Sequence, residues 1–161
     1  METNRFPVRQ QIRLPRAAYR QGHCFFLTIS TFDRHPWFAL HPELSDAVVE
    51  LLNRTADERQ TKLYAWCLMP DHAHLLTQDP DVVELVRLFK GRATPYARRY
   101  DPRRRFWQRS FHDHGLRPDE PIRQVALYVF ENPLRAQLVN TVIDYRWSGS
   151  NVWRQWRSFY D

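Results

Sequence analysis

A predicted β-hairpin in the middle of the chain is the strongest constraint on the fold. Two runs of strand-forming residues, 63–69 (LYAWCLM) and 72–78 (HAHLLTQ), are joined by a Pro-Asp turn signal at 70–71. Because alternate side chains of a strand point to the same face, His72 and His74 project side by side. Imidazoles at this spacing can reach one metal ion, but two satisfied polar side chains beside a turn would look the same. The hairpin by itself leaves both interpretations open.

The remaining patterns place this hairpin in a mixed fold. β-branched and aromatic runs predict strands, and apolar residues at helical spacing predict helices. In chain order the predicted elements are a strand at 24–31, a helix at 42–58, strands at 63–69 and 72–78, a helix from Asp79 (N-cap) and Pro80 through Tyr100, a strand at 105–116, and a helix capped by Asp119 that runs up to Pro133. We therefore expect an α+β, ferredoxin-like split-βαβ fold (β-α-β-β-α-β) with an extra C-terminal helix. Two helices would cover one face of a four-stranded antiparallel sheet, leaving the other face free to hold a site.

Length and the distribution of apolar residues bound the organisation of the chain. The 161 residues suffice for one hydrophobic core, so we expect a single domain over 1–161, with 1–15 as a loose basic arm. The N-terminal residues lack the apolar core of a signal peptide, and no later window is apolar enough to cross a bilayer. Cys24 and Cys67 lie in apolar runs and are expected to be buried free thiols. Together these features predict a protein of the bacterial cytoplasm with no membrane partner.

Positive charge and aromatic rings gather in one stretch of the sequence. The net charge is +6, and of 24 basic residues only Lys62 and Lys90 are lysines. Between 92 and 109, seven arginines alternate with tyrosine, phenylalanine and tryptophan. Such a mixture suits single-stranded nucleic acid, because the charges meet the backbone and the flat rings meet unstacked bases. A codon bias toward arginine would explain the composition but not the clustering, and a solvated helix face followed by a basic loop also fits.

One set of candidate partners for the histidine pair is a second His-x-His pair on the strand predicted at 105–116. The four histidines of a closed zinc site would be His72, His74, His112 and His114. In the expected sheet order, the third and fourth strands flank the first strand rather than each other, which argues against this site. Cys67 is another possible ligand, although its apolar strand favours a core thiol.

A second set of candidate partners lies on the last predicted helix. Tyr128 and Asn132 are four residues apart and share a face, away from the core stripe that contains Val125 and Val129. An amide oxygen from Asn132 would complete a three-ligand site with open positions. An amphipathic helix with a boundary tyrosine and a terminal asparagine is the alternative. Pro133 disfavours helical geometry at Asn132, so we expect the helix to end or kink there.

Taken together, these segments resemble a known family. The motifs, spread over about 16–150, are LPRAAYRQGHCFFLTISTFDR, AWCLMPDHAHLL, RLFKGRATPYARRY, FWQRSFHDHGLR and YVFENPLRAQLV. The chain is similar to the single-tyrosine HUH (His-hydrophobe-His) transposases, in the branch of REP-associated tyrosine transposases. The family pattern Tyr-x-x-x-Asn-Pro appears as Tyr128 to Pro133. Ala73 is a small hydrophobe and the residues at 129–131 differ from the usual ones, but neither departure removes a catalytic group.

The resemblance implies a metal-dependent single-stranded DNA endonuclease and strand transferase. His72 and His74 would hold a divalent ion, Mg²⁺ or Mn²⁺, with Asn132 as third ligand, and Tyr128 on the C-terminal helix would be the nucleophile. Imidazole ligands favour Mn²⁺. The substrate would be REP-like palindromic hairpins with an adjacent tetranucleotide, cut through a 5′-phosphotyrosine intermediate by a monomer or homodimer. Candidate DNA contacts, chosen by position, are Arg16, Tyr19, Arg20, Lys90, Arg92, Arg103, Arg104, Arg105, Trp107, Gln108 and Arg109; Trp107 could equally be a core residue.

Motif order separates this family from its neighbours. Conjugative relaxases place the tyrosine before the histidine pair, and histidine-triad hydrolases need a third histidine where Leu76 stands. Rolling-circle initiators usually carry lysine at the position of Asn132. Two alternatives stay open: a non-catalytic DNA-binding regulator on the same scaffold, and a nickase that resembles a replication initiator.

Overall fold

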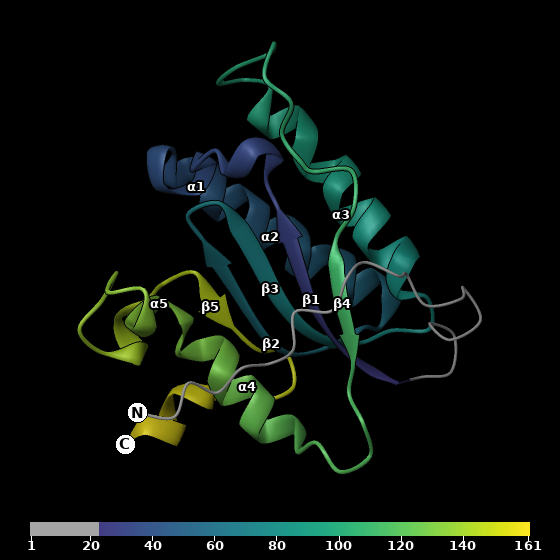
Figure 1. Cartoon of the computed structure of the whole chain (residues 1–161), viewed down its shortest axis with the longest axis vertical. Helices are drawn as coiled ribbons and strands as arrows, with labels where there is room; N and C mark the ends of the chain where they lie inside the picture. Colours follow the sequence, from purple (N-terminus) through teal and green to yellow (C-terminus); the bar gives the residue numbers. More distant parts are fainter. Residues whose placement is uncertain (1–22) are drawn as a thin grey trace.

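The computed structural model describes residues 23–161 and shows an α+β fold, with helices on both faces of one antiparallel sheet (Figure 1). In the described part of the chain the sheet has five strands in the order β4-β1-β3-β2-β5. The strands are β1 (Cys24–Ser30), β2 (Lys62–Met69), β3 (His72–Gln78), β4 (His112–Gly115) and β5 (Ser148–Gly149). The helices are α1 (Trp37–Leu40), α2 (Pro42–Arg59), α3 (Val82–Ala97), α4 (Ile122–Phe130) and α5 (Asn132–Arg135), with 3-10 turns η2 (Phe32–Arg34), η3 (Val142–Asp144) and η4 (Trp156–Tyr160).

The predicted hairpin forms the centre of the sheet. β3 has the predicted bounds, and β2 begins one residue earlier than predicted, at Lys62. Thr31, just beyond β1, holds the turn: its backbone N–H and its hydroxyl both donate to the carbonyl oxygen of Asp71, each at 2.9 Å. The residue that precedes His72 is therefore tied to the end of a neighbouring strand.

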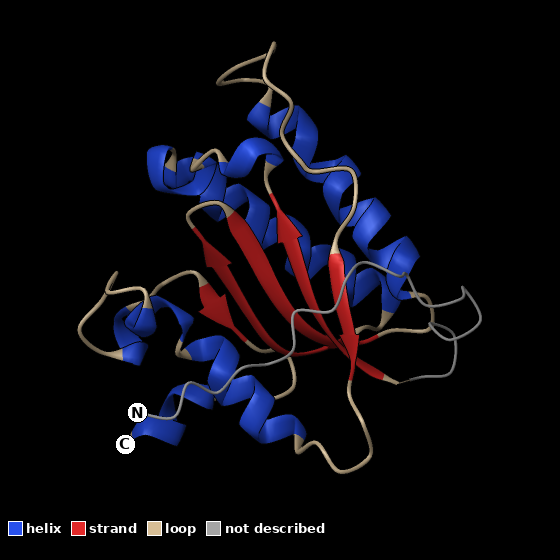
Figure 2. Ribbon diagram, in the orientation of Figure 1, coloured by secondary structure: helices blue, strands red, loops and turns tan. Residues whose placement is uncertain are grey.

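Two hydrophobic cores lie on opposite faces of the sheet (Figure 2). On one face, α2 and α3 pack over alternate residues of β1, including Phe25, Leu27 and Ile29. On the other face, α4 buries Ala126 and Val129 against β2 and β3. The second face is thus not free along its whole length, because α4 and the C-terminal residues cover part of it.

The fourth strand is much shorter than predicted. Phe106 and Trp107 lie in the core beside α1 and α3, and Trp107 makes only an isolated bridge to Thr31. Regular pairing with β1 begins at His112. The apolar residues of 105–111 are thus buried by side-chain packing rather than by strand pairing. A fifth strand, β5, was not predicted; it adds two residues beside β2.

The start of α3 also differs from the prediction. Asp81, not Asp79, is the N-cap of α3, and its carboxylate accepts from the backbone N–H of Glu84 at 3.2 Å. The Asp79 carboxylate is buried, where it accepts from the Arg59 guanidinium and the Thr61 hydroxyl. These hydrogen bonds link the end of α2 to the segment before α3. The Asp79 carboxylate therefore makes tertiary contacts instead of capping the helix.

The end of α3 and the start of α4 also differ from the prediction by a few residues. α3 ends at Ala97 rather than Tyr100, and α4 begins at Ile122, after Pro121 rather than after Asp119. No helix in residues 23–161 is long and apolar enough to span a bilayer. The predicted arm at 1–15 lies outside the described residues.

Candidate active site

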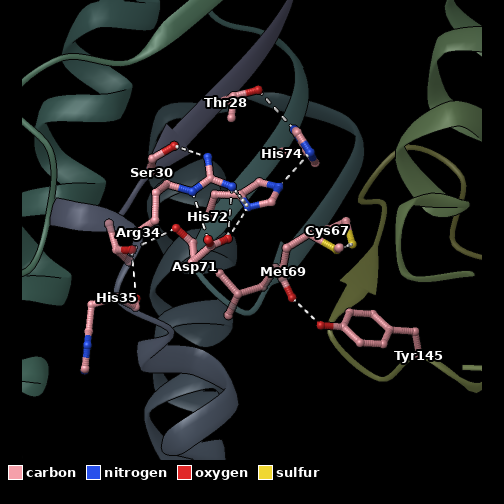
Figure 3. A network of polar contacts seen from close by, with 12 residues as sticks. Thr28, Ser30, Arg34, His35, Cys67, Met69, Asp71, His72, His74 and Tyr145 are labelled. Carbon is pink, nitrogen blue, oxygen red and sulfur yellow. Dashed lines mark hydrogen bonds and ion pairs between the residues drawn. The ribbon is translucent and has the colours of Figure 1, made fainter. Parts of the chain in front are cut away.

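The histidine pair lies at the beginning of β3, on the face that α4 covers in part. Strand register places His72 between Ser30 and Met69, and His74 between Thr28 and Cys67. The two rings meet edge to face, and their Nε2 atoms are 2.9 Å apart (Figure 3). The prediction that both imidazoles point to one place agrees with this arrangement.

The hydrogen bond on the far side of the His72 ring determines which of its nitrogens carries the proton, and the one on the far side of the His74 ring allows either tautomer. His72 Nδ1 is 2.6 Å from Asp71 Oδ1, and a carboxylate can only accept, so this nitrogen is the donor. His74 Nδ1 is 3.1 Å from the Thr28 hydroxyl, which can also accept. With both protons on Nδ1, the two Nε2 lone pairs face the same space. Such a convergence is unfavourable unless a proton or a cation lies between them.

The separation of the two nitrogens fits a shared metal ion. Two ligands at about 2.1 Å from one ion and about 90° apart would lie about 3 Å from each other, close to the observed 2.9 Å. Within residues 23–161, no group of three or more His, Cys, Asp or Glu side chains could hold a metal ion. Among other residue types, an amide oxygen is a suitable third ligand.

Asn132 lies directly after the end of α4. That helix ends at Phe130, and Asn132 opens the short helix α5 with Pro133 following it, as expected from the proline. The amide nitrogen of Asn132 donates to the carbonyl oxygens of Tyr128 and Val129, both at 3.2 Å. This orientation directs its Oδ1 away from those carbonyls, as a ligand role would require.

An aromatic contact links Tyr128 to the histidine pair. Phe26 of β1 stacks on His74, with ring centroids 5.3 Å apart and an interplanar angle of 21°. The same phenylalanine meets the Tyr128 ring edge-on, at 6.2 Å and 79°. Since α4 packs on β2 and β3, Tyr128 lies over the same face of the sheet as His74. Residues more than fifty positions apart in sequence thus come together.

Arg135 adds a positive charge beside the tyrosine. Its guanidinium carbon is 4.0 Å from the centroid of the Tyr128 ring. The guanidinium also donates to the Tyr128 carbonyl oxygen and pairs with Glu131 at 3.3 Å. These contacts hold it over the ring face, where a cation is attracted by the π electrons.

Both imidazoles are neutral at neutral pH. Burial lowers the pKa of His74 to about 3, and the charges of His72 and Arg135 act in the same direction. Burial also lowers the pKa of His72, although the hydrogen bond to Asp71 opposes this effect. Neutral imidazoles have the free lone pairs that metal binding needs.

The second His-x-His pair does not join the first. His112 of β4 is opposite Thr28 and therefore lies in the same row as His74, but β1 stands between them. Two strand spacings separate the backbones by about 10 Å. His114 instead contacts the Glu120 carboxylate, at 2.9 Å.

Cys67 also remains outside the candidate metal site. The side chain is 1% exposed, and its thiol donates to the Met69 sulfur at 3.6 Å. Burial raises the pKa of the thiol to about 12, so it stays protonated. A protonated core thiol is a poor metal ligand. The expectation of a buried free thiol is confirmed for Cys67, whereas Cys24 is a free thiol that is only half-buried.

Three of the predicted DNA contacts take part in tertiary structure. Lys90 donates to the backbone oxygen of Gln108 at 2.6 Å, and Arg92 pairs with Glu58 at 2.7 Å. Trp107 is 5% exposed and packs against Phe89, so it is a core residue. Gln108 is half-buried.

The exposed arginines of the predicted DNA surface are Arg103, Arg104, Arg105 and Arg109. Arg105 lies over the Phe32 ring at 4.9 Å, just beyond the end of β1 that pairs with the start of β3. Arg105 therefore lies beside the end of the sheet where His72 lies. Arg16, Tyr19 and Arg20 fall outside the described residues.

Several residues of this site were not identified from the sequence. They are Phe26, Thr28, Arg34, Asp71 and Arg135. Asp71 adjoins His72 in the chain, so its position was a visible signal. Arg135 follows Asn132 by three residues, whereas Phe26, Thr28 and Arg34 come from distant segments, and no local pattern marks these four as site residues.

The likeness to known proteins agrees with this geometry. A family model described as transposase IS200 like matches residues 23–132, about two thirds of the chain. The chain belongs to this family. This IS200-like transposase is 26% identical, over 150 residues, to a Haemophilus influenzae protein described as a REP-associated tyrosine transposase. The match covers 83% of the chain and 82% of that relative.

A solved structure shares the fold of this IS200-like transposase. It is the structure of a REP-associated tyrosine transposase bound to a REP hairpin, with a TM-score of 0.67 and 21% sequence identity. The match covers 87% of this chain and 82% of the other. The α+β fold class and the transposase resemblance predicted from the motifs are both confirmed.

Proposed function

We propose that this IS200-like transposase is a metal-dependent endonuclease and strand transferase that acts on single-stranded DNA beside hairpin-forming repeats. The observation that carries the proposal is the convergence of the His72 and His74 Nε2 atoms, 2.9 Å apart, with Tyr128 joined to them through Phe26. A relative with this fold is bound to a REP hairpin, which supports the same class of substrate.

His72, His74 and Asn132 would hold the ion. A divalent cation bound there would polarise a phosphate oxygen as a Lewis acid. Two neutral imidazoles and an amide bring no negative charge, so these ligands alone bind a cation weakly and a DNA phosphate would strengthen binding. Imidazole donors favour Mn²⁺ over Mg²⁺.

Tyr128 would be the nucleophile. Its phenol oxygen attacks phosphorus, a new O–P bond forms, and the bond from phosphorus to the 3′ oxygen breaks. The phenol gives up its proton and the departing 3′ oxygen gains one, which leaves a 5′-phosphotyrosine and a free 3′-OH. Because one phosphoester replaces another, a second 3′-OH can reverse the step and join a new strand without ATP.

Arg135 would assist this attack. A phenol has an ordinary pKa of about 10 and is a weak nucleophile at neutral pH unless a nearby cation favours the charge that develops on it. The Arg135 guanidinium lies 4.0 Å from the ring centroid and can supply that charge.

The exposed arginines would carry much of the affinity for DNA. Arg105 lies near the end of the sheet that holds His72, and the exposed Arg103 and Arg104 precede it in the chain, so a strand that contacts Arg105 would pass close to the histidine pair. Their contacts with phosphates are electrostatic, and hairpin binding is therefore expected to weaken as the salt concentration rises.

A DNA-binding regulator without catalysis and a replication-initiator-like nickase are the alternatives. A regulator has no use for converging imidazoles with a tyrosine beside them, which favours the enzyme.

Formation of a covalent adduct tests the proposal directly. The protein is incubated with labelled single-stranded hairpins from its own genome and Mn²⁺, and adducts are separated on a denaturing gel. Wild type is expected to form an adduct, and Tyr128→Phe and His72→Ala are expected to form none while still binding the hairpin. Tyr64→Phe is the matched control, because Tyr64 bonds to Gln78 at the opposite end of the sheet.

Two results would count against the enzyme. An adduct with Tyr128→Phe would show that another residue is the nucleophile. Tight binding of hairpins by wild type, with no cleavage of any of them, would favour the regulator.

A further inference from the structure

We propose that Asp71, held by Arg34, is a positioning residue that fixes the tautomer and the orientation of His72 for metal binding. The inference rests on the proposed function in one respect, the metal role of the histidine pair. It concerns two residues to which the family resemblance assigns no role.

The first observation is the geometry of the carboxylate. Asp71 Oδ1 accepts from His72 Nδ1 at 2.6 Å, and its Oδ2 accepts from Arg34 Nε at 2.8 Å (Figure 3). Arg34 Nη2 also reaches Oδ1, at 3.3 Å. The guanidinium thus donates to both oxygens of the carboxylate, and one of these oxygens also accepts from the imidazole.

The second observation concerns which ring nitrogen of His72 carries the proton. Arg34 Nη2 is 3.3 Å from His72 Nδ1, and a guanidinium can only donate. The shorter contact with the carboxylate decides the matter, because it requires a proton on Nδ1. His72 Nε2 is then left as a lone pair directed at His74. Carboxylate-histidine pairs of this kind orient metal-ligating histidines and raise their basicity.

The third observation is the backbone that carries Arg34. Asp33 and Arg34 both have φ of 54°, a left-handed conformation that is uncommon for residues other than glycine. This turn brings the guanidinium back toward the end of β1, where Nη1 lies 3.4 Å from the Ser30 hydroxyl. Unusual backbone conformations persist where the surroundings hold them and are found preferentially at functional sites.

The two histidines differ in how firmly their proton is fixed. Thr28, the partner of His74, has a hydroxyl that can donate or accept, so it does not impose one tautomer. Only His72 has an obligatory acceptor. We therefore expect the loss of Asp71 to weaken metal binding more than the loss of the Thr28 hydroxyl.

Substitution of Asp71 tests the side chain without removing the turn. The contacts from Thr31 go to the backbone oxygen of Asp71 and remain in any variant. Asp71→Ala removes the acceptor, and Asp71→Asn keeps an oxygen that can accept from Nδ1 but loses the charge. Glu120→Ala is the matched control, since Glu120 joins His114 and Arg117 in the same manner outside the site.

Two measurements read the positioning role independently of cleavage. Mn²⁺ affinity is measured by calorimetry with the hairpin bound, in a Tyr128→Phe background that prevents cutting. The tautomer of His72 is read from ¹⁵N chemical shifts of the metal-free protein. Asp71→Ala is expected to lower Mn²⁺ affinity about 10–100-fold and to mix the tautomers, with a smaller loss for Asp71→Asn and none for Glu120→Ala.

Cleavage by the variants, with Tyr128 restored, separates this inference from the proposed function. Asp71→Ala should need more Mn²⁺ for half-maximal cleavage yet approach the wild-type rate when Mn²⁺ is saturating. Mn²⁺ affinity in Asp71→Ala equal to that in Glu120→Ala, with wild type still forming an adduct, would overturn the positioning role alone. Wild type that binds Mn²⁺ but forms no adduct would overturn the proposed function alone.

Discussion

At the scale of single residues, the tyrosine and the histidines depend on neighbours that come from elsewhere in the chain. Phe26 of β1 contacts both His74 and Tyr128, and Arg135 lies over the tyrosine ring from the segment after α4. Each contact fixes a ring that would otherwise have several rotamers. The reactive groups are therefore held by packing and charge from at least three separate segments.

The guanidinium over Tyr128 leads to a prediction about rate. Arg135→Gln removes the cation but keeps a polar side chain, and a cation-π contact is worth about 0.5–2 kcal/mol. We expect the single-turnover rate of adduct formation to fall about tenfold, with Mn²⁺ affinity little changed. Arg157→Gln is the control, because Arg157 lies 4.6 Å from the Trp156 ring in a similar contact. Equal rates for the two variants would contradict a role for Arg135.

The sequence predicted the ligand and nucleophile candidates but not their supports. His72 and His74 are related by strand periodicity, and Tyr128 and Asn132 by helix periodicity, but the roles of these residues came from the family resemblance and not from the local patterns. Arg135 reaches Tyr128 only because the chain breaks between α4 and α5. Pro133 marks this break in the sequence, but the contact of Arg135 with the tyrosine ring depends on how the chain packs after it.

At the scale of elements, the edge strand β5 lies unusually close to a side chain of its neighbour β2. Gly149 of β5 pairs with Trp66, and a Cβ atom at this glycine would lie 2.4 Å from Trp66 Cζ2. The indole is 6% exposed, so it has little room to move away. β5 is thus possible only because its second residue lacks a side chain.

Gly149→Ala is therefore expected to destabilise the protein. Overpacking of this kind costs about 1–3 kcal/mol in the free energy of unfolding, which urea denaturation can measure. Gly91→Ala provides the contrast, since nothing lies within 4 Å of the added Cβ. That substitution in α3 should stabilise the protein by up to about 1 kcal/mol. A loss of stability in Gly91→Ala as large as in Gly149→Ala would refute the argument from space.

The seven-residue strand β3 was predictable from the sequence, and the two-residue strand β5 was not. β3 is seven residues long, with alternating burial in its first four residues, and was predicted to the residue. β5 has two residues, too few for any periodic pattern, and its partner lies about eighty positions earlier. Asp79 looks like a helix cap in sequence, but Arg59 and Thr61 engage its carboxylate in the folded chain.

At the scale of the whole molecule, the sheet separates two cores of different character. The core under α2 and α3 is built mostly of aliphatic and phenylalanine side chains, with three tryptophans. The core under α4 includes a thiol, Cys67, and the stacked pair Phe130 and Trp156, whose ring centroids are 4.1 Å apart. The Cys67 thiol is a weak acid, and its burial in the second core makes the stability of the protein depend on pH.

Burial raises the pKa of the Cys67 thiol from its ordinary value of 9.0 to about 12. As pH rises, the unfolded chain loses this proton first, so the stabilisation is complete below pH 9 and is lost between pH 9 and about 12. The loss amounts to about 1.4 kcal/mol per pH unit in that interval. We expect Cys67→Ala to show a flatter fall in unfolding free energy, measured in urea at alkaline pH. Identical slopes for wild type and variant would exclude this thiol as the cause.

The stacking of Trp156 on Phe130 has a consequence for the C-terminal end of the chain. Phe130 closes the helix that carries Tyr128, and Trp156 comes from the C-terminal end of the same chain. The C-terminal segment therefore packs against the helix that carries Tyr128.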